Sequence, residues 1–121
     1  MAEQVNDLIK ELFEQFSLRI KIRRGKSALV LVTSPKQISI ENADGAMAIR
    51  GEEWRLSLVG IDKVRFLRVE TTGKMGRGVD FLNAAGKSVV RLAVRRLDER
   101  AVDTFDRLCH KYAMISTGAT T

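Results

Sequence analysis

The chain has 121 residues, of which 45% are hydrophobic and 30% charged, and its formal net charge is +6. This length fits one domain, and the composition is that of a folded soluble protein rather than a disordered one. One cysteine and one histidine exclude a disulfide framework and a metal cage of these residue types, so no metal site is predicted. No apolar run approaches the ~20 residues that span a bilayer, and we expect a cytoplasmic protein.

Two segments have the apolar spacing of amphipathic helices. At the N-terminus, apolar residues recur every three or four positions, which predicts a helix over 3–16 with an acidic outer face. A second stripe predicts a helix over 98–113, with Asp98 as its N-cap. The residues of the two stripes are Val5, Leu8, Ile9, Leu12, Phe13 and Phe16, then Val102, Phe105, Leu108, Cys109 and Tyr112. The small and polar residues 116–121 are expected to form a flexible tail.

Between these helices, residues 18–95 change to a period of two, which predicts about eight short, mostly antiparallel strands. In the first of them, apolar residues alternate with Arg19, Lys21 and Arg23, so one face is basic. Residues 28–32 are all apolar, which predicts a strand covered on both faces. The expected fold is α+β, a single domain of residues 1–115 whose strands form a curved sheet, a sandwich or an open barrel.

Glycine-containing segments predict the turns between strands. Residues 24–27 and 83–86 have turn chemistry. Residues 73–78 contain three glycines, which predicts a loop. Backbone N–H groups of such a loop can form a nest for an anion, with Lys74 and Arg77 adding positive charge.

The cations are unevenly distributed along the chain. Residues 18–36 hold six Lys or Arg residues and no acid, and residues 63–100 hold ten against four acids. Such regions attract anions, whether these are nucleic acids, phospholipid headgroups, acidic proteins or small carboxylates.

The sequence shows no catalytic constellation. Cys109 and His110 are neighbours on the second predicted helix, so their side chains diverge by about 100°. Cys109 is expected in the core and His110 on the surface. The carboxylates fall mostly on helix faces and in turns, without a visible acid–base pair. These features favour a binding protein over an enzyme.

A series of short motifs occupies residues 64–108. They are Val64-Arg65-Phe66-Leu67, Met75-Gly76-Arg77, Asp80-Phe81-Leu82-Asn83-Ala84-Ala85-Gly86, the strand 88–94, Arg96, Asp98-Glu99-Arg100, Phe105 and Leu108. In order and spacing they resemble the end of the cytosolic haem-utilisation carriers, the HutX/ChuX family. Weaker similarity extends back to Leu18. One departure is the strand that often carries a Gly-His pair in that family, because residues 54–58 contain no histidine here.

The resemblance implies a small α+β protein with curved antiparallel sheets that binds haem between sheet and loops, often as a homodimer. The cations that it implies for the haem propionates are Arg65, Lys74, Arg77 and Arg91. The side chains of a type that could ligate the iron are Met75, His110 and Tyr112. The expected function is that of a non-enzymatic haem carrier, with haem as its anionic ligand.

Two other functions fit the residues. Antiparallel strands followed by a helix are also typical of a pleckstrin-like interaction module. Its acidic protein partner or anionic headgroup would bind near Arg19, Lys21, Arg23, Arg24 and Lys26. The net charge also fits a basic nucleic-acid-binding domain, whose affinity would fall steeply with salt. A symmetric homodimer through an exposed edge strand or the acidic helix is a separate expectation.

Overall fold

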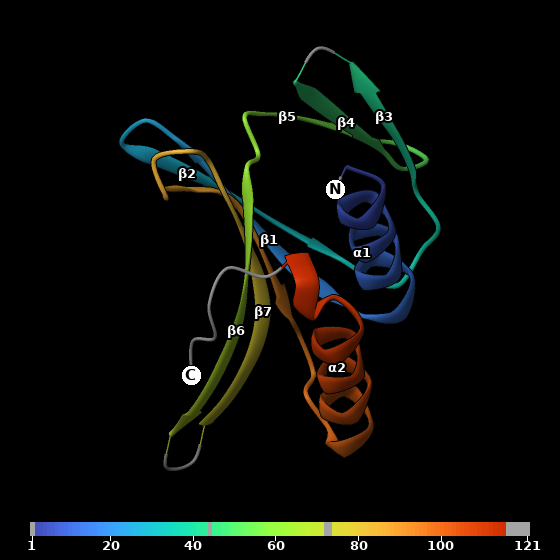
Figure 1. Cartoon of the computed structure of the whole chain (residues 1–121). Coiled ribbons are helices and arrows are strands. Elements are labelled where there is room, and N and C mark those ends of the chain that lie inside the picture. Colours follow the sequence, from blue (N-terminus) through green and yellow to red (C-terminus); the bar gives the residue numbers. More distant parts are fainter. Residues whose placement is uncertain (1, 44, 72–73, 116–121) are drawn as a thin grey trace.

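The computed structural model describes residues 2–43, 45–71 and 74–115, which form an α+β fold (Figure 1). The predicted tail 116–121 lies outside the described residues. In chain order the elements are α1 (Ala2–Gln15), β1 (Leu18–Arg24), β2 (Ser27–Thr33), β3 (Ser39–Ala43), β4 (Ala46–Arg50), β5 (Arg55–Val59), β6 (Lys63–Thr71), β7 (Lys74–Leu82), β8 (Ser88–Val94), α2 (Glu99–Lys111) and the short 3-10 helix η1 (Ala113–Ile115). Both predicted helices are thus present, and Asp98 caps α2 by accepting a 2.8 Å hydrogen bond from the Ala101 N–H. None of the helices in these ranges is long and apolar enough to cross a membrane.

The strands form two open sheets rather than a barrel. The larger sheet has five strands in the order β2-β1-β8-β7-β6, and the smaller has three in the order β3-β4-β5. Every neighbouring pair is antiparallel, which confirms the predicted strand arrangement. Because β1 pairs with β8, the first and last strands of the chain lie side by side in the middle of the larger sheet.

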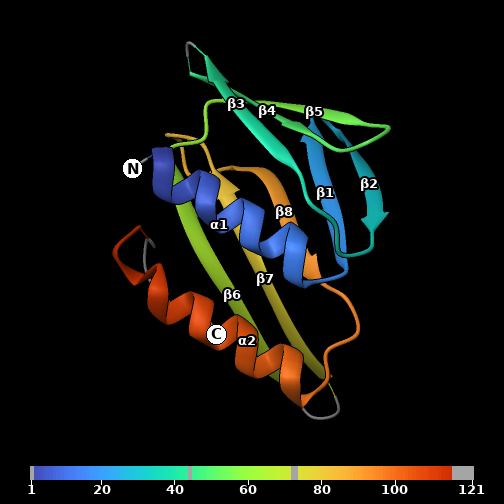
Figure 2. The same ribbon diagram turned by 90° about the vertical axis from the view of Figure 1, so that its right-hand side faces the viewer.

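The core lies between the helices and one face of the five-stranded sheet (Figure 2). Phe105 of α2 makes edge contacts with Phe16, at 6.2 Å between ring centroids, and with Phe66 of β6, at 6.1 Å. Phe13 of α1 stacks on Trp54 at 5.6 Å, just before β5. The apolar stripe of α1 therefore joins both sheets into one core.

The prediction that residues 28–32 are covered on both faces is wrong. β2 is an edge strand, and Leu29, Val30 and Val32 are 45%, 41% and 55% exposed. A continuous apolar run indicates a strand but does not reveal how many neighbours the strand has. Here its only strand partner among the described residues is β1.

The prediction of a glycine-rich loop at 73–78 is also wrong for the described residues 74–78. They belong to β7 and pair with β6, so their backbone groups serve the sheet rather than an anion nest. Glycine is required at one of these positions for a packing reason. A Cβ on Gly78 would lie 2.9 Å from the carbonyl oxygen of Leu92 in β8, closer than side-chain carbons come to backbone oxygens.

Candidate functional site

The five-stranded sheet has one face that α1 and α2 leave uncovered (Figures 1 and 2). We call it the open face. Residues directly opposite each other in an antiparallel pair share a face, so the register assigns its members. They are Ala28, Val30 and Val32 of β2, Arg19, Lys21 and Arg23 of β1, Arg91 and Ala93 of β8, Gly78 and Asp80 of β7, and Arg65, Leu67 and Val69 of β6.

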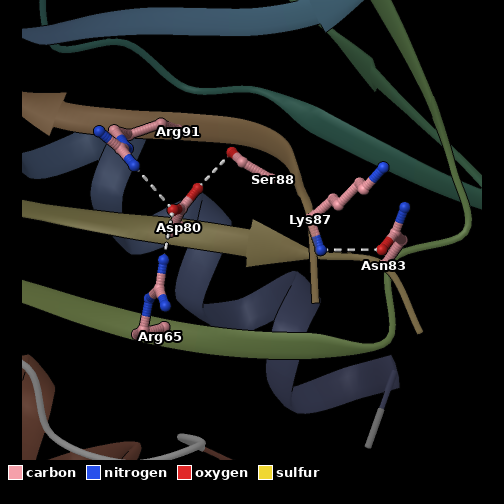
Figure 3. A network of polar contacts seen from close by, with 6 residues as sticks. All are labelled: Arg65, Asp80, Asn83, Lys87, Ser88 and Arg91. Atoms are coloured by element: carbon pink, nitrogen blue, oxygen red, sulfur yellow. Dashed lines mark hydrogen bonds and ion pairs between the residues drawn. The ribbon is translucent and has the colours of Figure 1, made fainter. Parts of the chain in front are cut away.

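A buried carboxylate organises the cations of this face. The side chain of Asp80 is fully buried, and its Oδ2 lies 3.2 Å from Nη2 of Arg65 and 3.0 Å from Nη2 of Arg91 (Figure 3). The Ser88 hydroxyl donates to Oδ1 of the same carboxylate. The register explains this meeting, because Arg65, Asp80 and Arg91 occupy one row across three adjacent strands.

The cluster retains positive charge toward solvent. One carboxylate faces two guanidinium groups, and the side chains of Arg65 and Arg91 are 35% and 44% exposed. A guanidinium has five N–H donors, so each arginine keeps donors for a further carboxylate. Lys21 lies directly opposite Arg91 on β1 and extends the row of cations.

Beside this row the open face bears few large side chains. The adjacent row across the strands runs through Arg19, Ala93, Gly78 and Leu67. Gly78 has no side chain and is itself buried, whereas Leu67 and Ala93 are half-buried, and Ala93 contributes only a methyl group above the backbone. The result is an apolar platform, formed by Leu67, Gly78 and Ala93, with a row of cations along one side.

The other predicted site residues lie elsewhere. The side chain of Arg77 is only 3% exposed, and its Nε lies 3.3 Å from Oδ1 of Asp106 in α2, on the helix-covered side of the sheet. His110 is exposed one turn further along α2. The structure thus brings Arg65 and Arg91 together and separates them from Arg77 and His110. The side chains of Lys74 and Met75 lie outside the described residues.

Tyr112, the remaining candidate iron ligand, is 7% exposed at the end of α2. Its hydroxyl donates to Oε2 of Glu11 in α1. Burial and this hydrogen bond raise the pKa of the Tyr112 phenol, so it keeps its proton at neutral pH. Tyr112 therefore joins the two helices rather than offering a phenolate.

Two hollows in the described residues differ from the open face in charge or polarity. One, of about 390 Å³, lies between α1 and the small sheet, and Asp62 is the charged residue that lines it. Its volume suits a small molecule, but its carboxylate repels an anionic ligand. The other, of about 480 Å³, is lined by Arg95, Arg96 and Arg100, together with Asp98 and mostly polar or small groups. The open face, in contrast to these two hollows, combines an apolar surface with a row of cations.

Comparisons with known proteins support the fold. No family model matches the chain, and no curated protein matches it either. Solved structures do match. A structure of ChuX has 14% identity and a TM-score of 0.71, over 89% of this chain and 72% of ChuX. A second structure, of "the Heme Binding Protein ChuX", has 12% identity and a TM-score of 0.66, over 89% of this chain and 70% of that one. The heme-binding protein PhuS from Pseudomonas aeruginosa, in its holo form, has 16% identity and a TM-score of 0.67.

The chain therefore has the α+β fold of the haem-binding proteins ChuX and PhuS over about nine-tenths of its length. It corresponds to 32% of PhuS, so that longer protein contains more than this one unit. At these identities the likeness establishes the fold and leaves the ligand to be argued from the residues.

Proposed function

We propose that the protein is a small, non-enzymatic, cytoplasmic haem carrier that holds haem on the open face. The observation that carries this proposal is the apolar platform of Leu67, Gly78 and Ala93 beside the cations held by Asp80. It occurs in a chain that has the fold of ChuX and PhuS.

The chemistry of haem fits this surface. Its macrocycle is a flat apolar ring, for which the half-buried side chains of Leu67 and Ala93 offer apolar contact, with the buried Gly78 between them adding no side chain. Its two propionates are carboxylates, for which arginine offers paired N–H donors. Arg65 and Arg91 are held in place by Asp80, so little side-chain entropy is lost when they bind a second anion.

The described residues of the open face include no histidine, cysteine, tyrosine or methionine that could ligate the iron. The ring and the propionates then supply the binding energy. Such a mode suits a cargo that is accepted from one protein and passed to another. The described ranges also contain no cluster of three or more Asp, Glu, Cys or His side chains that could hold a metal ion.

A haemin titration followed by Soret absorbance tests the proposal. We expect saturable one-to-one binding that weakens by about tenfold in Arg91→Gln, because a charge-assisted hydrogen bond contributes about 1.5–3 kcal/mol. Lys21→Gln is a second variant that should weaken haemin binding. It leaves the Asp80 cluster intact, because Lys21 makes no contact with that buried carboxylate. Arg107→Gln and His110→Ala, both on exposed positions of α2, are controls that should bind normally. Haemin dimethyl ester, which lacks both carboxylates, should bind more weakly than haemin.

Two results would contradict the proposal. One is a non-saturating response, such as albumin-like non-specific uptake, in the unmodified protein. The other is equal affinity for haemin and its dimethyl ester. If an oligonucleotide instead binds with an affinity that falls steeply with salt, the same cations serve a nucleic acid.

A further inference from the structure

The edge strand β2 leaves apolar residues exposed on both of its faces. On the open face Val30 and Val32 are 41% and 55% exposed, and on the opposite face Leu29 is 45% exposed. Figure 2 shows β2 as the outermost strand of the five-stranded sheet. Every second backbone N–H and C=O of such a strand points away from the sheet, ready to pair with a further strand.

β2 lacks the charges that usually protect a sheet edge. Edge strands in soluble proteins commonly carry lysine, proline or other charged residues that prevent pairing with foreign strands. The other edge strands here follow this pattern, with Glu41 in β3, Arg55 in β5 and Lys63 in β6. The seven residues of β2, Ser27–Thr33, include no charged residue and no proline. This edge is therefore chemically suited to strand addition.

The charge next to this edge indicates the kind of strand that fits. On the open face, the strand beside β2 presents Arg19, Lys21 and Arg23 opposite Val32, Val30 and Ala28. Residues 18–36 contain six cations and no acid. A second copy of this chain would bring the same positive charge to the edge, whereas an acidic strand would be attracted to it.

We propose that β2 is a docking edge for an extended acidic segment of another protein, which pairs with residues 28–32 as a sixth strand. Side chains of a strand alternate between faces. Those on the open face would be acidic, to meet the basic row of β1. Those on the other face would be apolar, to cover Leu29. The partner segment thus alternates acidic and apolar residues.

The spacing allows the ion pairs. An added strand lies two strand spacings, about 10 Å, from β1. Only the short side chains of Ala28, Val30 and Val32 intervene, and glutamate and arginine extend toward each other over them. This distance is close to the Debye length of about 8 Å at physiological salt, so the attraction should fall as salt is added.

The test uses three synthetic peptides of equal length, each with a fluorophore, and fluorescence anisotropy. One alternates Val and Glu, the second alternates Val and Lys, and the third replaces each Val of the first by Pro. We expect the Val-Glu peptide to bind at least about tenfold more tightly than either of the others, because the second has the wrong charge and the third cannot complete backbone pairing. Hydrogen exchange should slow at residues 28–32 when the Val-Glu peptide is present.

Variants locate the site. Val30→Glu places a carboxylate on the exposed edge and should weaken Val-Glu binding. The double variant Arg19→Glu and Lys21→Glu should reverse the preference, so that the Val-Lys peptide binds better. Arg100→Glu combined with Arg107→Glu changes the net charge equally at exposed positions of α2 and should leave the preference intact.

Three outcomes would overturn the proposal. The first is no binding, or equal binding of all three peptides. The second is an unchanged preference in the β1 double variant, which would place the peptide elsewhere. The third is self-association of the free protein that protects residues 28–32, which would make a second copy the occupant. None of these outcomes depends on haem, so this proposal and the proposed function fail separately.

Discussion

At the scale of single residues, Asp80 is the group that the sequence did not reveal. Arg65, Asp80 and Arg91 lie 15 and 11 positions apart, and only the register of three strands brings them together. The alternation of β6 and β8 predicts that both arginines face away from the core. It does not predict that a carboxylate between them is buried.

Replacing Asp80 by Asn should destabilise the fold by about 1–3 kcal/mol, because two guanidinium groups lose their shared counter-charge. The partial exposure of both arginines keeps this cost below that of a fully buried pair. Glu41→Gln removes the exposed ion pair with Arg50 and should cost less than about 0.5 kcal/mol. Urea unfolding of both variants measures the difference in the free energy of unfolding. Equal losses would show that the Asp80 cluster stabilises the protein no more than an exposed ion pair does.

Cys109 provides a prediction about pH. Burial raises the pKa of its thiol to about 11, because desolvation disfavours the thiolate. Between the pKa of the thiol in the unfolded chain and about 11, the native protein keeps this proton while the unfolded chain loses it. The free energy of unfolding therefore falls as the pH rises through that range. At pH 8, alkylation of Cys109 by iodoacetamide should be at least about tenfold slower in the native protein than in urea, since thiolate is the reactive form. A native rate equal to the unfolded rate would contradict the protection expected for the half-buried Cys109.

At the scale of elements, the two glycines of β7 differ in what surrounds them. A Cβ on Gly78 would lie 2.9 Å from the Leu92 carbonyl oxygen, whereas on Gly76 its nearest neighbour would be Cβ of Val69 at 3.5 Å. The second distance is an ordinary van der Waals contact, and the first forces β7 and β8 apart.

Gly78→Ala should therefore destabilise the protein by about 1–3 kcal/mol. Gly76→Ala, its matched control two positions away, should change stability by less than about 0.5 kcal/mol. Thermal and urea unfolding test both. A similar loss of stability at the two positions would contradict this explanation, because the close approach of β8 exists only at Gly78.

The elements also show what sequence reasoning can and cannot supply. The stripes of α1 and α2 and the alternation of β1, β4 and β5 report one buried face each, and such patterns are read directly from the residues. The predictions for β2 and for residues 74–78 of β7 are wrong for a common reason. Whether an apolar run is an edge, and whether glycines are a turn or a strand, depends on neighbours that are distant in the sequence.

At the scale of the whole molecule, the fold has separated two kinds of cation. Arg77 is enclosed between the sheet and α2, where it pairs with Asp106, while Arg65, Arg91 and the β1 cations face outward from the same sheet. The sequence resemblance grouped Arg65, Arg77 and Arg91 into one site because all three lie on the segments that it implies around a haem. Strand alternation divides them between two faces, and only one face is left open by the helices (Figure 2).

If the open face holds haem, as we propose, an experiment that locates the ring will detect it there. Amide chemical shifts of isotopically labelled protein would be followed during titration with zinc protoporphyrin, a diamagnetic analogue that keeps both propionates. We expect the largest shifts at Leu67, Gly78 and Ala93, with smaller ones at Lys21 and Arg91. Shifts centred on His110 and α2, or on Met47 and Leu58 beside the acidic hollow, would contradict it.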